Sequence, residues 1–318
     1  MNGDLRASDI RAGDMRIGLD IGATKVLGAI VADDGSVLAQ AREATVHGPD
    51  GVLATATTVL GRLAAALARA DGAWALPAHV GIGFPGLVDR DRGAVSHAVN
   101  VGIGGDWFPL GERLAERTAA VVVVENDVRA ATWGAHVLTG ANDLGYISLG
   151  TGLAAGFVLD GVLRRGAYGA SGEIGHVPVD PHGARCSCGQ RGCLELAAAA
   201  SAVTAAWPAS GESSPSVALF AAAAAGDPEA VAARDRYAAG VADAIRMVGL
   251  VIDPSVIILG GGVTDLGEPL LAAATAALRA QAATSPFLAA LDLASRVRLL
   301  PGQLPVGAIG AALIGKGR

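Results

Sequence analysis

All three cysteines of this chain lie within eight residues, and this cluster limits what the chain can fold into more than any other feature. They are Cys186, Cys188 and Cys193, and His176 lies ten residues before the first of them. Three thiolates and one imidazole fill the four positions of a tetrahedral zinc site. A closed set of four protein ligands leaves no position for water, so the sequence predicts a structural zinc rather than a hydrolytic one.

Two other interpretations of the cysteines fit the sequence less well. Three unrelated buried cysteines would have no reason to gather beside a histidine in a chain that has no other cysteine. A disulfide between Cys186 and Cys188 would be strained, because a single residue separates them. An odd number of cysteines also leaves one thiol over.

The stretch Gly172–Glu195, GEIGHVPVDPHGARCSCGQRGCLE, resembles the signature of the ROK family of sugar kinases, repressors and open reading frames. That signature is G-E-x-G-H followed by C-x-C-G-x-x-G-C-x-E, and both parts are present without a departure. The resemblance implies that Glu173, His176 and Glu195 hydrogen-bond a sugar and that His176 also binds the zinc. This agrees with the chemistry of a zinc-bound imidazole, whose second ring N–H needs a partner such as a sugar hydroxyl.

The composition fits a helix-rich α/β protein. The chain has 318 residues, enough for two domains, and is 52% hydrophobic but only 4% aromatic. Its net charge of -6 gives no basic excess for nucleic acid or an anionic membrane. No apolar run is expected to reach the length of a membrane span. The N-terminal residues lack the apolar core of a signal peptide, so we expect a cytoplasmic protein with a disordered tail over residues 1–15.

Two similar strand–turn–strand segments are predicted to bind the phosphates of a nucleotide. The first, IGLDIGATKVLGAIV, has a glycine and a hydroxyl in its turn, and an aspartate that can hold Mg²⁺ through water. The second, LGYISLGTGLAAG, repeats this pattern. The first differs from the Walker pattern and is similar to the first phosphate motif of the superfamily that contains sugar kinases and actin; an ordinary hairpin is the alternative. The predicted nucleotide-binding residues are Asp20, Gly22, Thr24, Lys25, Gly150, Thr151 and Gly152.

A run of four valines, Val121–Val124, leads directly into Glu125-Asn126-Asp127. The valines are typical of a strand buried on both faces, and open α/β sheets bind ligands beyond the carboxyl ends of their strands. An acidic residue there could simply cap the helix predicted over Val128–Val137. However, ENDVRAA matches the E-N-D-x-x-A-A motif of the ROK family. That resemblance implies that Asp127 takes the proton of the sugar hydroxyl and that Asn126 is a sugar ligand.

Two more glycine turns are candidate ligand contacts. The predicted strand His79–Phe84 ends in a Pro-Gly turn, where the ROK resemblance places the sugar, so Gly86 is a candidate backbone contact. A simple strand-ending turn is the alternative. The predicted strand Val256–Leu259 leads into a glycine run that lets a flat base and ribose lie against the backbone. The resemblance makes this run the adenosine site, with Gly260, Gly261 and Gly262.

The resemblance and the two matching phosphate segments predict an α/β chain with a duplicated ribonuclease H-like fold of the actin and hexokinase type. Two lobes would then enclose a nucleotide cleft. We expect an N-terminal lobe of residues 16–124 with the C-terminal helix 306–318, and a C-terminal lobe of residues 125–305 that carries the zinc loop. Helical periodicity is found over Leu53–Ala70, and a long helix is predicted over Asp235–Leu250.

The resemblance implies ATP-dependent phosphorylation of a hexose, at O6 of glucose or a glucose-like sugar, with Mg²⁺ bridging the phosphates. The alternatives are a kinase for an aminohexose (kanosamine or glucosamine), a kinase for N-acetylglucosamine or N-acetylmannosamine, and a non-catalytic sugar-sensing regulator. A family repressor would need a winged helix of roughly 60–80 residues, and only 19 residues precede Asp20. We expect a hexose and ATP as ligands, no nucleic-acid or membrane partner, and a homo-oligomer, either a dimer or a tetramer.

Overall fold

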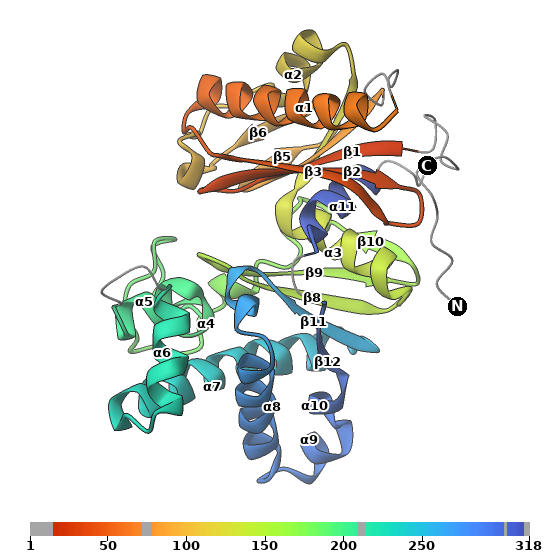
Figure 1. The fold of residues 1–318 in the computed structure, drawn as a ribbon. Coiled ribbons are helices and arrows are strands. Elements are labelled where there is room, and N and C mark those ends of the chain that lie inside the picture. The colour runs from red at the N-terminus through yellow and green to blue at the C-terminus, as the bar shows by residue number, and fades with distance from the viewer. Residues whose placement is uncertain (1–14, 72–77, 209–213, 302–303, 315–318) are drawn as a thin grey trace. The chain divides into compact units, whose positions relative to one another are not determined.

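Two units make up the chain, and the computed structural model describes residues 15–71, 78–208, 214–301 and 304–314. Unit 1 consists of Met1–Gly140 and Pro305–Arg318, and unit 2 of Ala141–Leu304. Figure 1 shows the C-terminal helix, in blue, among the elements of unit 1. The predicted tail lies outside the described residues except for Met15, where the first strand begins.

Unit 1 is a five-stranded sheet with helices on both faces (Figure 1). The strand predicted over His79–Phe84 is confirmed at both ends. The helix predicted over Leu53–Ala70 is also present and begins earlier, at Pro49. The elements are β1 (Met15–Ile21), β2 (Lys25–Ala32), β3 (Val37–Ala44), α1 (Pro49–Asp71), β4 (His79–Phe84), β5 (Leu87–Asp89), β6 (Ala94–Ser96), the 3-10 helix η3 (Val99–Val101), α2 (Leu110–Thr118), β7 (Val121–Asn126), α3 (Asp127–Thr139) and α11 (Val306–Leu313).

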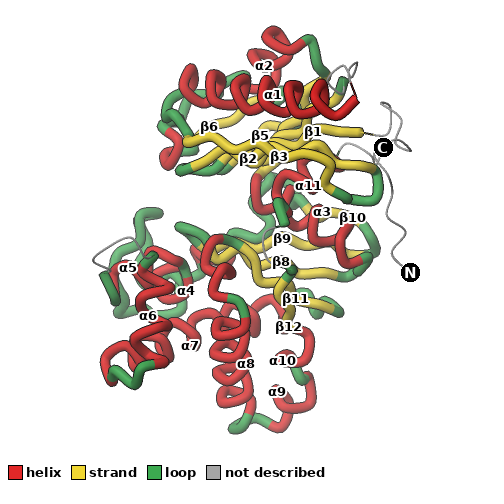
Figure 2. The backbone as a smooth tube through the Cα atoms, in the orientation of Figure 1, coloured by secondary structure: helices red, strands yellow, loops and turns green. Residues whose placement is uncertain are grey.

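Unit 2 contains a second five-stranded sheet and most of the short helices (Figure 2). Its longest helix begins at Pro228 rather than at the predicted Asp235, because the Asp227 carboxylate caps it by accepting two backbone N–H groups. The elements are β8 (Leu144–Leu149), β9 (Leu153–Leu159), β10 (Val162–Arg164), η4 (Ile174–His176), α4 (Glu195–Ala198), α5 (Ala200–Ala206), α6 (Pro215–Ala224), α7 (Pro228–Val251), β11 (Val256–Gly260), η5 (Gly262–Leu266), α8 (Glu268–Ala282), α9 (Pro286–Leu291), α10 (Leu293–Arg296) and β12 (Val297–Leu299).

The two sheets have the same topology, which confirms the predicted duplication. The strand orders are β3-β2-β1-β4-β7 in unit 1 and β10-β9-β8-β11-β12 in unit 2. In each sheet the first three strands form an antiparallel meander, and the last two strands run parallel to the first. Each predicted phosphate turn therefore joins the first two strands of its sheet.

Helix α1 corrects one expectation from the sequence. Over Pro49–Ala68 it is long and apolar enough, by length and composition alone, to cross a membrane. Its Leu53, Leu60 and Leu63 side chains are buried in the core of unit 1. A core helix of a globular unit also passes such a test, and the burial of these leucines assigns α1 to that core.

The boundary between the units also differs from the prediction. The predicted lobes meet between residues 124 and 125, inside β7, whereas unit 1 continues through α3 to Gly140. Helix α3 stays with unit 1 because it packs on β4 and on α11. The contact with α11 is close: a Cβ added at Gly310 would lie 1.7 Å from the backbone oxygen of Ala130. Small residues are therefore required where these helices meet.

The four-valine strand is not buried on both faces as predicted. β7 is the edge strand of its sheet, and 56% of Val121 is exposed. Only Val124 of the four is fully buried. An apolar run of this length cannot distinguish a central strand from an edge strand, because that depends on which elements pair with it.

Candidate active site and metal centre

The carboxyl ends of β1, β4 and β7 bring the predicted acidic residues of unit 1 to one edge of the sheet. Asp20 is in register with Gly83 on the parallel neighbour β4, and the next residue, Phe84, is in register with Asn126. A Cβ at Gly83 would lie 3.5 Å from the Cα of Asp127. The sheet therefore places Asp20 and Asp127 beside the same point of β4.

Asp20 and Asp127 also interact electrostatically. Burial raises the pKa of Asp20 to about 7, the charge of Asp127 adds to this rise, and Lys25 opposes it. Asp20 and Asp127 together form a suitable oxygen donor set for Mg²⁺, a hard cation that prefers carboxylate and water oxygens. The carboxylate of Asp20 also lies against the first turn of α11, where a Cβ at Gly307 would be 2.6 Å from its Oδ2. Glycine at this position leaves room for the carboxylate.

The raised pKa of Asp20 gives a prediction about stability. The folded protein binds this proton more tightly than the unfolded chain, so the contribution of Asp20 to stability is fully present at acidic pH and is lost as the pH rises from about 4 through 7. Without magnesium or nucleotide, Asp20→Asn should be more stable than the wild type at pH 8, by on the order of 1–3 kcal/mol. The difference should shrink toward pH 5. Urea unfolding at pH 5, 6.5 and 8 measures this, and a gap that does not change with pH would contradict it.

Asn126 and Asp127 occupy the start of α3. The side chain of Asn126 caps the helix, since its Oδ1 accepts the backbone N–H groups of Val128 (3.1 Å) and Arg129 (3.2 Å). Its Nδ2 donates to the backbone oxygen of Gly86 (3.4 Å). Asp127 is the first residue of the helix, and its Oδ1 also accepts the N–H of Val128 (2.9 Å). The N-cap itself is Asn126, in the role that the sequence left open for the acidic residue. Two predicted sugar contacts, Asn126 and the turn at Gly86, are thus joined within unit 1.

The first phosphate turn presents its polar groups to solvent. The backbone N–H of Gly22 donates to the oxygen of Lys25 (2.9 Å), which closes the turn between β1 and β2. Thr45, which directly follows β3, donates from Oγ1 to the oxygen of Gly22 (2.7 Å) and so holds the turn in place. Thr24 and Lys25 are exposed. Their hydroxyl and ammonium groups are therefore available to an anionic ligand.

The second phosphate turn has the same design in unit 2. The backbone N–H of Gly150 donates to the oxygen of Gly152 (3.1 Å), and Thr151 is exposed. The N–H of Ala200, the first residue of α5, donates to the oxygen of Gly150 (2.8 Å). The turn is thereby fixed to the helical segment that follows the cysteine loop.

The four predicted zinc ligands form one cluster in unit 2. Their ligand atoms all lie within 4.8 Å of one another. Cys188 Sγ is 3.6 Å from Cys193 Sγ, and Cys186 Sγ is 3.9 Å from His176 Nδ1. Zn–S bonds of about 2.3 Å place two tetrahedral thiolates about 3.8 Å apart. The spacing therefore fits a four-coordinate zinc, and all three cysteines are free rather than disulfide-bonded.

The thiols of the cluster differ in their acidity. Hydrogen bonding by the backbone N–H of Gln190 lowers the pKa of Cys188 to about 6, so this residue is largely a thiolate at neutral pH. Burial raises the pKa of Cys193 to about 12 and also raises that of Cys186. Coordination to zinc deprotonates a thiol outright and would reverse this effect of burial.

Glu195 lies between the cysteine cluster and the second phosphate turn. Its Oε1 is 2.9 Å from Cys186 Sγ and 3.6 Å from His176 Nδ1. A Cβ at Gly152 would lie 3.3 Å from its Oε2. The contact with Cys186 is one that would brace the zinc loop, a second role for Glu195 besides that of a sugar ligand. Glu173, by contrast, is exposed at the start of η4.

The glycine run that begins with the last residue of β11 has a structural cause that the sequence did not show. A Cβ at Gly260 would lie 1.9 Å from the hydroxyl oxygen of Tyr146, and one at Gly261 would lie 2.6 Å from the backbone of Leu149. These two glycines are needed so that the run can pack on β8. A Cβ at Gly262 would meet no atom within 4 Å, so this residue has the open space that a ligand needs.

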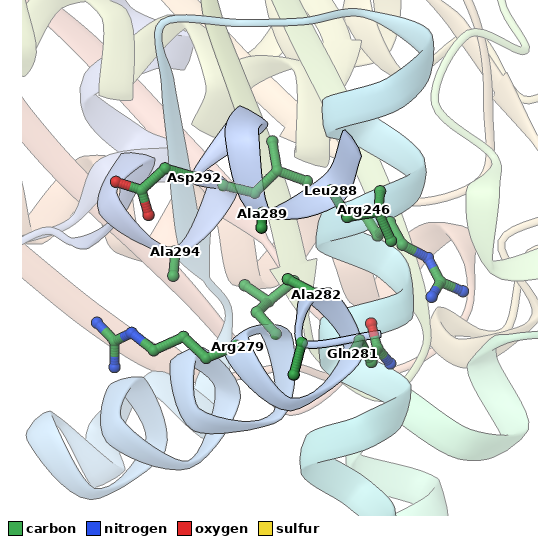
Figure 3. A pocket seen from close by; sticks show the side chains of 11 residues that line it. Arg246, Arg279, Gln281, Ala282, Leu288, Ala289, Asp292 and Ala294 are labelled. Atoms are coloured by element: carbon green, nitrogen blue, oxygen red, sulfur yellow. The ribbon is translucent and has the colours of Figure 1, made fainter. Parts of the chain in front are cut away.

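A cavity of about 280 Å³ lies elsewhere in unit 2, between α7, α8, α9 and α10 (Figure 3). Leu278, Leu288 and Leu293 line it together with several alanines, and Arg246 and Arg279 are also part of its wall. None of the predicted site residues contributes to it. This cavity is therefore separate from the metal cluster and from the glycine turns.

The duplicated sheets, the paired phosphate turns and the Cys₃His cluster define a zinc-site α/β protein of the actin and hexokinase fold class. Residues 16–316 match the ROK family. The chain is 33% identical over 276 residues to the glucokinase of Thermotoga maritima, covering 80% of this chain and 84% of that protein. It is 31% identical over 249 residues to N-acetylmannosamine kinase of Yersinia pseudotuberculosis, covering 78% of this chain and 82% of that enzyme.

A solved structure agrees with these relatives. The ROK family glucokinase of Streptomyces griseus, in complex with glucose and AMPPNP, superposes with a TM-score of 0.78 at 29% identity and covers 95% of this chain and 100% of its own. The chain belongs to the ROK family. The family resemblance and the fold expected from the sequence are both confirmed.

Proposed function

We propose that this chain is an ATP-dependent hexose kinase that phosphorylates O6 of glucose or a glucose-like sugar. The observation that carries the proposal is the meeting of Asp20 and Asp127 at one edge of the unit 1 sheet, in a member of a family that includes glucokinases. Phosphoryl transfer depends mainly on positioning and on charge stabilisation. One carboxylate oriented on the sugar hydroxyl is therefore chemically sufficient.

The residues of unit 1 have separate proposed roles in catalysis and binding. Asp127 accepts the proton of the attacking hydroxyl, and Asn126 and the backbone at Gly86 orient the sugar. Asp20 would hold Mg²⁺ through water; when bound, this ion neutralises charge on the phosphates. The turn from Gly22 to Lys25 donates backbone, hydroxyl and ammonium hydrogen bonds to the phosphate oxygens.

Unit 2 carries the other residues that we propose to bind ligands. The turn of Gly150, Thr151 and Gly152 receives phosphates, and the run Gly260, Gly261 and Gly262 receives adenosine, with Gly262 offering the most space. Zinc on the Cys₃His cluster would fix the loop that carries the sugar ligands. If Nδ1 of His176 binds the metal, Nε2 is left to hydrogen-bond a sugar hydroxyl, as Glu173 and Glu195 would also do.

A coupled ADP-release assay tests the proposal directly. The sugars to compare are glucose, glucosamine, kanosamine, N-acetylglucosamine, N-acetylmannosamine, mannose and fructose, each with ATP and magnesium. Turnover of at least one hexose supports a kinase. Sugar binding without turnover of any of them would favour the non-catalytic sugar sensor instead.

Sugar choice gives a second test. Carboxylates accept hydrogen bonds from hydroxyls and attract an ammonium group, whereas an N-acetyl group offers one N–H and a carbonyl that a carboxylate repels. Because Glu173 and Glu195 would face the sugar, we expect kcat/KM to be higher for glucose or a free aminohexose than for the N-acetyl form. Glu195→Gln should change these ratios, which steady-state kinetics on glucose, glucosamine, kanosamine and N-acetylglucosamine measures.

N-acetyl sugars remain the second candidate substrates, because N-acetylmannosamine kinases are among the relatives. A wild-type preference for N-acetylglucosamine would contradict the expected selectivity. Unchanged ratios in Glu195→Gln would assign that residue to the zinc loop alone, in line with its contact to Cys186.

We also propose that the protein works in the cytoplasm as a homo-oligomer, either a dimer or a tetramer. Three free cysteines arranged as metal ligands support a reducing compartment. Light scattering of the purified protein gives the mass that decides its oligomeric state.

A further inference from the structure

A buried charged pair flanks the proposed base, Asp127, in the chain. The side chains of Glu125, on β7, and Arg129, on α3, are only 1% and 7% exposed, and Arg129 Nε donates to Glu125 Oε1 at 2.8 Å. Arg90 approaches the other carboxylate oxygen, with its Nε 4.0 Å from Oε2. Glu125 is the first residue of the E-N-D motif, but no role was predicted for it or for Arg129; their i, i+4 spacing across the junction of strand and helix is a signal that could have indicated the pair.

Packing alone does not explain this pair. Removing two charges from water costs more than their attraction commonly returns, and well-packed apolar residues often replace a buried ion pair without loss of stability. A buried pair is therefore weak evidence for a contribution to stability. Its place in the chain is more informative, because Asn126 and Asp127 lie between the two partners.

The hydrogen bonds show what the pair holds. Glu125 Oε1 accepts not only from Arg129 Nε but also from the backbone N–H of Asn126 (3.1 Å). Asn126 in turn caps α3 through the N–H groups of Val128 and Arg129, and its Nδ2 reaches the oxygen of Gly86. Arg129 thus fixes the carboxylate of Glu125, and this carboxylate fixes the peptide that leads into Asp127.

We propose that Glu125 and Arg129 are positioning residues that set the orientation of Asn126 and Asp127 toward the sugar. The inference rests on the proposed function insofar as Asp127 is the base. Misplacing a reacting group by about 1 Å can cost roughly a hundredfold in rate. Loss of the pair should therefore lower kcat by about 10- to 100-fold and leave the KM for ATP unchanged.

Three variants separate positioning from stability. Arg129→Met leaves a buried carboxylate without this partner and should lower both the unfolding midpoint and kcat. Arg129→Lys keeps the charge and should recover part of kcat. The double variant Glu125→Met, Arg129→Met should recover the unfolding midpoint but not kcat, because the N–H of Asn126 has lost its acceptor. Arg62→Met is the control, since Arg62 forms an ion pair with Glu43 elsewhere in unit 1 and should keep wild-type kcat.

Hydrogen exchange measures the order at the start of α3 and does not depend on turnover. The backbone amides at positions 128 and 129, which donate to Asn126, should exchange faster in the double variant than in the wild type, while those of β8 should not change. A double variant with wild-type kcat and wild-type exchange would overturn the inference. If the wild type phosphorylates no hexose, the proposed function fails, and exchange at these two amides still decides whether the pair positions Asn126.

Discussion

Asp127→Asn is expected to lower kcat for hexose phosphorylation by roughly 10²–10⁴, the usual contribution of a positioned general base. Asparagine has nearly the same shape but cannot accept the proton of the sugar hydroxyl. The fold should persist, because the cap of α3 is provided by Asn126. Sugar affinity should also persist, since only the proton acceptor is removed. Steady-state kinetics and calorimetric titration with the sugar measure both quantities.

Glu112→Gln is a matched control for this change. Glu112 is an exposed carboxylate in the first turn of α2, so its replacement tests the loss of a negative charge at a helix start in the same unit. It should leave kcat unaffected. Near-normal turnover in Asp127→Asn would remove Asp127 from the role of base, whatever the stability of the variant.

Features that depend on local chemistry could be predicted from the sequence. A glycine turn between two apolar strands occurs twice, and the two sheets that follow from it have the same strand order. The cysteine cluster was predicted because metal ligands must be few, soft and close together, and their ligand atoms do lie within 4.8 Å of one another. Such features are set by residues near one another in the chain.

Features that depend on distant partners could not be predicted. Val121 is exposed because no strand among the described residues pairs beyond β7, and the unit boundary lies at Gly140 because α3 packs on α11 from the far end of the chain. Gly260 was explained by ligand approach, whereas its neighbour Tyr146 on β8 also requires a glycine there. Each of these depends on a contact between segments far apart in sequence.

Cys188→Ser is expected to lower stability and hexose affinity together, and to remove most of the zinc. Wild-type protein purified without chelator should contain one zinc per chain, held by His176, Cys186, Cys188 and Cys193. Binding of structural zinc releases on the order of 10–16 kcal/mol in small peptides, and part of it is folding energy. Cys188 is the most acidic thiol of the cluster, because the Gln190 N–H lowers its pKa to about 6. Serine does not supply the thiolate.

Elemental analysis, thermal unfolding and sugar titration of the same samples test this result. Ser187→Ala is the control: Ser187 lies between two ligands in sequence, its Oγ is 3.9 Å from Cys186 Sγ, and it is not part of the metal cluster. It should retain zinc and sugar affinity. Zinc content and sugar affinity should change together because of Glu195, whose Oε1 is 2.9 Å from Cys186 Sγ. Loss of the metal frees the loop that holds this carboxylate, and with it the proposed sugar ligands. Wild-type protein without zinc, or Cys188→Ser with full sugar affinity, would separate the metal from sugar binding.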